Sequence, residues 1–221
     1  LYRGNEIMKG LILKDLLNLR KNLKTIIIMC LFYTLLFSTL NPTFLSGMIT
    51  ILFAMQILTT FSYDDYSKWN MYALSLPITK KQLVLSKYIL GISFIIFGGV
   101  FSFILTSLLS LFKGSFILGD LVASIIGSTG IMILMILILL PLIFKYGVER
   151  SRIMLLAIFA IPTVLILIIS KVLALTGIPF PSEEQLNALL PVICIIATLI
   201  LIAGSYVSYM TSVKIVTKKE Y

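Results

Sequence analysis

The sequence predicts an all-α polytopic membrane protein that crosses the bilayer with six helices and keeps both termini in the cytoplasm. The chain has 221 residues, of which 59% are hydrophobic and 12% are charged, whereas about 25% of the residues in a soluble domain are charged. Its apolar residues form continuous runs, each long enough for a helix to cross a hydrocarbon core. A transmembrane β-barrel is disfavoured, because barrel strands are about ten residues long and alternate in polarity.

The expected elements follow the apolar runs along the chain. Residues 1–22 are expected to form a cytoplasmic amphipathic elbow helix, and residues 23–209 a six-helix transmembrane domain. A cytoplasmic coupling loop is expected at residues 62–87 and a cytoplasmic tail at residues 210–221. The six spans are predicted at about 23–40, 43–61, 88–112, 121–144, 153–175 and 189–209. This arrangement leaves no room for a separate soluble catalytic domain.

The orientation follows from the basic residues. Of the 18 lysines and arginines, all but Lys113 and Lys171 lie before the first span, after the second, after the fourth or after the sixth. Lysine and arginine near the ends of spans stay on the cytoplasmic side, which places both termini there. The net charge of +9 is therefore explained by membrane topology, and no nucleic-acid partner is expected.

The segment before the first span has helical amphipathic spacing. Its apolar residues recur at Met8, Ile12, Leu16, Leu19 and Leu23, which suits a helix lying in the lipid interface. Its polar positions include Lys14, Arg20 and Lys21, which would face anionic head groups. The alternative is a basic flank that only sets topology. The first span is expected to stay uncleaved, and Met8 is a candidate natural start.

The longest polar stretch, Ser62–Lys87, contains the only tryptophan, Trp69, and the adjacent acids Asp64 and Asp65. Two short helices are predicted within it. The first would begin at Ser62, with Asp65 completing a capping box, and the second would begin after Thr79, with Gln82 in that role. Pro77 disfavours helix at the preceding residue. The exposed aromatic residues suit docking to a protein partner, and the alternative is an ordinary loop with interfacial aromatic residues.

This order of segments resembles the short type-2 permeases of bacterial ATP-binding cassette (ABC) transporters. The resemblance rests on the sequences YDDYSKW at 63–69, SLPITKK at 75–81 and SKY at 86–88. It implies a half-transporter in the bacterial plasma membrane that pairs with a second permease, as a homodimer or heterodimer, and binds a cytoplasmic ATPase subunit. On that resemblance the elbow helix spans Met8–Leu23 and the coupling helix Asp64–Leu74. The implied ATPase-docking residues are Asp64, Asp65, Tyr66, Lys68, Trp69 and Tyr72.

No chemistry of its own is expected of this chain. A phosphate-binding loop needs Gly-Lys followed by Ser or Thr, and no glycine here precedes a lysine. The chain has no histidine, and Cys30 and Cys194 lie singly in apolar runs. We therefore expect a non-catalytic subunit without a metal or cofactor, whose partner ATPase binds ATP and Mg²⁺.

The spans contain no central charge that could relay ions, but small residues recur in them at four-residue spacing. This spacing is typical of helix packing seams in membranes, and contact with the substrate is the alternative. The seam residues are Gly98, Ser102, Ala123, Gly127, Gly204 and Ser208.

The predicted function is ATP-driven export of a hydrophobic or amphipathic peptide, as in the exporters of phenol-soluble modulins and bacteriocins that this chain resembles. One alternative is a membrane anchor or immunity protein that binds a partner without transport. A membrane-embedded enzyme is a weaker one: Glu183-Glu184 is similar to the glutamate pair of intramembrane prenyl-type proteases, but the arginine and histidines that those enzymes need are missing.

Overall fold

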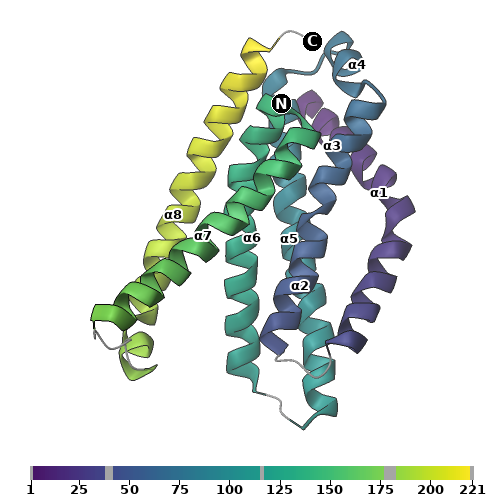
Figure 1. Cartoon of the computed structure of the whole chain (residues 1–221). Coiled ribbons are helices and arrows are strands. Elements are labelled where there is room, and N and C mark those ends of the chain that lie inside the picture. The colour runs from purple at the N-terminus through teal and green to yellow at the C-terminus, as the bar shows by residue number, and fades with distance from the viewer. Residues whose placement is uncertain (1, 38–41, 115–116, 177–182, 220–221) are drawn as a thin grey trace.

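The structure is a computed structural model that describes residues 2–37, 42–114, 117–176 and 183–219. These residues form a helical bundle, and no strand occurs among them (Figure 1). The helices are α1 (Tyr2–Leu36), α2 (Pro42–Ala54), α3 (Gln56–Tyr66), α4 (Trp69–Ser75), α5 (Lys80–Phe112), α6 (Leu118–Tyr146), α7 (Val148–Thr176) and α8 (Glu183–Lys218). The all-helical fold class is confirmed for the described part of the chain.

Five helical stretches of the described residues are long and apolar enough to cross a membrane. They are Phe44–Tyr66, Lys80–Phe112, Leu118–Tyr146, Val148–Leu173 and Pro191–Lys218. The first joins α2 and α3, which are separated only at Met55. The predicted first span, 23–40, lies mostly in α1 and ends outside the described residues. Six crossings therefore stay a prediction, and five have structural support.

The N-terminal segment differs from the two separate elements expected at residues 1–22 and 23–40. Instead, α1 is one unbroken helix of 35 residues that changes direction part-way along its length (Figure 1). It contacts α2, α3 and α5. The amphipathic segment is thus attached rigidly to the apolar segment that follows it, and its role as an elbow helix stays a prediction.

The C-terminal segment also differs from the expected tail. Helix α8 continues through residue 210 to Lys218, and Ser212, Val213 and Val216 are buried against the rest of the bundle. The Lys80 ammonium donates hydrogen bonds to the carbonyl oxygens of Thr217 and Lys219. The last residues described therefore stabilise the start of α5.

The bundle is centred on α5, which contacts α1, α2, α3, α6 and α8. Small residues allow the central helices to approach closely. A Cβ atom added to Gly98 of α5 would lie 2.6 Å from the Cβ atom of Phe53 on α2, closer than two carbon atoms can pack. One helical turn further, the buried Ser102 hydroxyl donates to the Ser46 carbonyl oxygen of α2 at 3.3 Å. The two helices meet along this line.

A buried hydroxyl network joins α5, α6 and α8. The Tyr88 hydroxyl lies 2.6 Å from the Ser208 hydroxyl and 2.8 Å from that of Ser212. Ser208 in turn donates to the carbonyl oxygen of Leu137, while Gly204 packs against the Leu137 side chain. In an apolar medium such hydrogen bonds orient helices that hydrophobic packing alone would not align.

The remaining seam residues, Ala123 and Gly127, lie on an exposed face of α6, where a Cβ on Gly127 would meet no other atom within 4 Å. Helices α7 and α8 also expose most of their apolar surface, because only 6% of the apolar stretch in each is buried inside the bundle. A surface of that kind is suited to lipid or to another transmembrane helix.

Candidate functional site

Helix α4 and its flanking turns form a helical corner at one end of the bundle. Helix α3 ends at Tyr66, and Lys68 then takes the left-handed conformation with φ of 50°, which turns the chain into α4 at Trp69. Leu76 is extended before Pro77, as expected for a residue that precedes proline. The capping box of Thr79 and Gln82 that starts α5 is confirmed in both of its hydrogen bonds.

The predicted helix start at Ser62 is wrong. Ser62 lies inside α3, and its hydroxyl donates to the carbonyl oxygen of Leu58 at 3.0 Å. Helix α3 thus continues from the apolar span through Asp64 and Asp65 without a break. The sequence pattern of a capping box is present there, but those residues are already within a helix.

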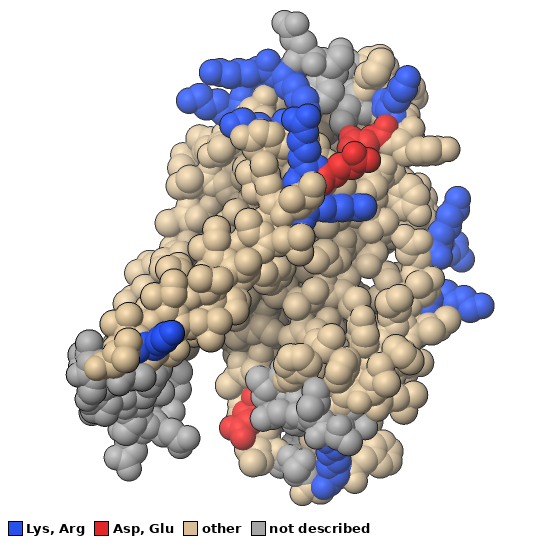
Figure 2. All heavy atoms as spheres, viewed as in Figure 1, with Lys and Arg blue, Asp and Glu red and all other residues tan. Residues whose placement is uncertain are grey.

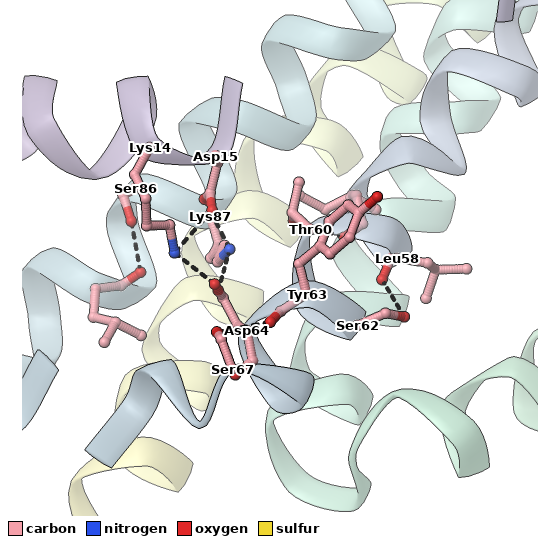
Figure 3. Close-up of polar contacts among 12 residues, drawn as sticks. Lys14, Asp15, Leu58, Thr60, Ser62, Tyr63, Asp64, Ser67, Ser86 and Lys87 are labelled. Carbon is pink, nitrogen blue, oxygen red and sulfur yellow. Dashed lines mark hydrogen bonds and ion pairs between the residues drawn. The ribbon is translucent and has the colours of Figure 1, made fainter. Parts of the chain in front are cut away.

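A buried cluster of four charged residues lies beside this corner (Figure 3). It joins Lys14 and Asp15 of α1, Asp64 of α3 and Lys87 of α5. Lys87 Nζ lies 2.8 Å from Asp15 Oδ2 and 2.6 Å from Asp64 Oδ2, and Lys14 Nζ lies 2.5 Å from Asp64 Oδ1. We call these four residues the ion-pair cluster.

The ion-pair cluster is neutral as a whole, and three of its four members are almost completely shielded from solvent, whereas the Lys14 side chain is 21% exposed. Asp15, Asp64 and Lys87 are each 2–3% exposed. The second carboxylate oxygen of Asp15 lies 3.0 Å from Lys14 Nζ without a hydrogen bond. Removing one member of a buried ion pair leaves an unpaired charge and costs about 3–5 kcal/mol. The cluster therefore holds α1, α3 and α5 in one relative arrangement.

Two aromatic rings complete the surroundings of the lysines. Lys14 Nζ lies 4.2 Å from the centre of the Trp69 ring on α4, and Lys87 Nζ lies 4.9 Å from the centre of the Phe61 ring on α3. Cations at such distances are attracted by the negative face of the ring. The first contact links α4 directly to the ion-pair cluster.

Comparison with known protein families gives a match over nearly the whole chain. Residues 10–217 match the family described as ABC-2 family transporter protein. The chain belongs to the ABC-2 transporter family. No curated protein and no solved structure matches it. Membership makes it a multi-pass membrane protein and the permease subunit of an ABC transporter, which associates with a cytoplasmic ATPase.

The structure places the predicted docking residues of this ABC-2 permease in two groups. Asp65, Tyr66, Lys68 and Tyr72 are exposed, and Tyr66 and Tyr72 are 92% and 58% exposed. Asp64 instead points into the ion-pair cluster. Their role in docking stays a prediction, and only the exposed group can reach a partner without rearrangement.

Trp69 and the basic residues of α1 have mixed positions. Trp69 is half-buried, because one face packs on the hydrophobic core and on Lys14. Arg20 and Lys21 are exposed on α1, whereas Lys14 belongs to the ion-pair cluster. Helix α1 of the permease, the predicted elbow helix, therefore carries both exposed basic side chains and an internal contact.

Sequence reasoning missed Asp15 and Lys87 as site residues. Asp15 stands four residues after Leu11 and four before Leu19, which are both buried, so it lies on the buried stripe of α1. Lys87 stands four residues after the buried Leu83. A charge on a buried stripe requires an opposite charge nearby, so this signal could have marked each residue as a member of a buried ion pair without identifying its partner.

On the face that Figure 2 shows, most of the Lys and Arg side chains lie toward the end of the molecule that carries α4. Both ends of the described chain lie at this end as well (Figure 1). That arrangement is required if both termini are cytoplasmic, and the side of the membrane stays a prediction. Among the described residues, no group of three or more His, Cys, Asp or Glu could hold a metal ion.

Proposed function

We propose that this ABC-2 permease exports a hydrophobic or amphipathic peptide, driven by an ATPase subunit that docks on the corner formed by the end of α3 and by α4. The observation that carries the proposal is the exposure of Tyr66, Met71 and Tyr72 at this corner. Exposed aromatic and methionine side chains are enriched at protein interfaces. At the predicted cytoplasmic end of this permease, a partner protein would bury them.

The contacts between the corner and the rest of the bundle could transmit a displacement of α4 to the spans. A displacement of α4 changes the contact of Trp69 with Lys14 on α1. Lys14 shares Asp64 with Lys87, so the same displacement acts on α3 and α5. Because buried ion pairs tolerate little separation, we expect α1, α3 and α5 to follow α4 as a unit when the ATPase moves.

The energy source is expected to lie in another chain. The permease lacks the Gly-Lys sequence of a phosphate-binding loop, so ATP and Mg²⁺ would be bound and used by the ATPase subunit, and the permease would be non-catalytic. The exposed apolar faces of α7 and α8 support pairing with a second permease in the bacterial plasma membrane, either a copy of this chain or a related one.

An apolar or amphipathic cargo agrees with the chemistry of the spans. The charged residues of α5, α6 and α7 lie near the helix ends, and the central turns of these helices carry none. A strongly charged cargo would lack partners along such a path. A peptide with an apolar face needs none.

Docking is tested by co-purifying the permease with a candidate ATPase encoded beside it. We expect Tyr72→Ala and Asp65→Lys to weaken the complex, and Phe112→Ala to leave it intact because Phe112 is an exposed aromatic residue at the other end of α5. Complexes of equal yield in all three variants would contradict docking at this corner.

Cargo is tested on the complex reconstituted in liposomes. We expect amphipathic peptides to stimulate ATP hydrolysis and to accumulate on the side opposite the ATPase. Stimulation by ions or small drugs alone would contradict peptide export and leave the docking assignment standing.

A further inference from the structure

Two neighbouring cavities between α3 and α7 share one arginine. The larger has a volume of about 640 Å³ and is lined by Ser62, Asp65, Glu149, Arg150 and Arg152 among others. The smaller has a volume of about 350 Å³ and is also lined by Arg152. Its remaining lining is largely apolar: Met55, Leu58, Thr59, Leu155 and Leu156. A polar cleft thus continues into an apolar groove at Arg152.

The charges of the polar cleft do not neutralise one another by contact. Among the described residues, Asp65, Glu149 and Arg150 form no ion pair. Arg152 donates a hydrogen bond to the Ser62 hydroxyl at 3.1 Å, and it forms no ion pair among the described residues. The nearby ion-pair cluster, in contrast, has every charge in contact with an opposite one. The cleft therefore offers two positive and two negative groups to a ligand.

The two cavities follow one another along the helices in a fixed order. On α7, Leu155 and Leu156 lie three and four residues beyond Arg152, about 4.5 and 6 Å deeper into the span. On α3, Leu58 lies one turn before Ser62, on the side of the apolar span. Going inward from the end of the bundle, a ligand would meet charges first and then hydrocarbon.

We propose that a phospholipid whose head group carries a phosphate and a primary ammonium binds between α3 and α7. Its phosphate would contact Arg152 and Arg150, because guanidinium groups bind phosphate oxygens through paired hydrogen bonds. Its ammonium would contact Asp65 and Glu149. One acyl chain would lie in the groove of Leu58, Leu155 and Leu156.

The net charge of the cleft and the order of charged and apolar groups along the helices favour this head group. A purely anionic head group would satisfy the arginines and face two carboxylates. The predicted cytoplasmic end of a span is also the depth at which lipid head groups lie, and basic pockets between helices on that side bind them. An amphipathic peptide could match the apolar groove, but it has no phosphate group for the two arginines. The site is independent of the proposed cargo, but its cleft shares Asp65 and Tyr66 with the proposed docking corner. Its test therefore measures lipid binding to the permease alone, without the ATPase.

The test titrates the purified full-length chain in mild detergent with phosphatidylethanolamine, phosphatidylglycerol or phosphatidylcholine of identical acyl chains, and counts bound lipids by native mass spectrometry. We expect phosphatidylethanolamine to bind most tightly. Arg152→Gln should weaken its binding about tenfold, as expected for loss of a charge-assisted contact. The matched control Arg20→Gln, an exposed arginine on α1, should bind as the wild type does.

A second pair of variants tests the groove on one helix. Leu156→Asn should weaken lipid binding, whereas Ile153→Asn should not, because both side chains are about 70% exposed on α7 and only Leu156 lines the groove. The proposal is overturned if phosphatidylglycerol or phosphatidylcholine binds as tightly as phosphatidylethanolamine, or if the control variants lose as much binding. It is also overturned if Arg152→Gln weakens the binding of a synthetic Leu/Lys amphipathic peptide but of no lipid. A third contradicting result would be that Arg152→Gln changes the fraction of dimer and leaves lipid binding unchanged.

Discussion

Lys87 of α5 and Asp15 of α1 are 72 residues apart in the sequence, and their charged atoms lie 2.8 Å apart in the interior of the bundle. Asp64 of α3 lies against the same lysine at 2.6 Å. The end of α3, the start of α5 and the part of α1 that crosses them are thus joined by charge. These ion pairs link the proposed docking surface to the spans.

Removal of the central lysine should destabilise the fold strongly. Lys87→Met leaves two buried carboxylates with only Lys14 as a partner, and we expect the free energy of unfolding to fall by about 3–5 kcal/mol. Denaturant unfolding in detergent, followed by circular dichroism, measures this change. Lys81→Met is the matched control, because Lys81 is an exposed lysine six residues earlier on α5. Equal effects of the two substitutions would show that the cluster does not stabilise the bundle.

Exchange of the two charges should restore part of the loss. We expect Asp15→Lys and Lys87→Asp to be strongly destabilising as single substitutions, since each places like charges together. The double variant recreates an opposite pair, so its loss of unfolding free energy should be smaller than the sum of the two single losses by about 1–3 kcal/mol. Additive losses would mean that the two residues do not interact.

Trp69 should report on Lys14. Trp69 is the only tryptophan of the chain, so the intrinsic fluorescence of the protein on selective excitation comes from this ring. Removing the ammonium 4.2 Å from the ring by Lys14→Met should shift the emission maximum or intensity. Lys9→Met should leave the spectrum unchanged, because the Lys9 side chain is 76% exposed and pairs with Glu6. Unchanged spectra in both variants would contradict the contact.

Two glycine substitutions should have opposite effects. Gly98→Ala places a methyl group 2.6 Å from the Cβ of Phe53, and overpacking of this kind costs about 1–3 kcal/mol. Gly127→Ala meets no atom within 4 Å, and alanine in a helix is favoured over glycine by about 0.5–1 kcal/mol. Thermal unfolding of both variants measures the difference. A more stable Gly98→Ala variant would contradict the close packing of α2 and α5.

Local signals in the sequence predicted local structure well. The apolar runs predicted the helices, Pro77 the extended residue before it, and Thr79 with Gln82 the start of α5. These features depend on neighbouring residues. The same kind of signal failed at Ser62, because the apolar helix before it continues and Asp64 gains buried partners only by staying in α3.

The ion-pair cluster could not be predicted from local patterns. Asp15, Asp64 and Lys87 belong to three segments, and nothing in any one segment specifies the other two. Asp64 was expected to face the ATPase because the resemblance to ABC permeases places it in the coupling helix. Its burial depends on how α1 crosses the ends of α3 and α5, which is a property of the tertiary fold.

The central claim is that an ATPase subunit docks on the corner at α4, and site-specific photo-crosslinking tests it most directly. A photoreactive phenylalanine derivative would replace Tyr72 in the intact permease–ATPase complex, and the same derivative at Tyr206 would serve as control. Both tyrosines are exposed, but only Tyr72 lies at the corner. We expect a covalent permease–ATPase product from position 72 and none from position 206. A complex that forms normally but gives no product from position 72 would contradict the claim.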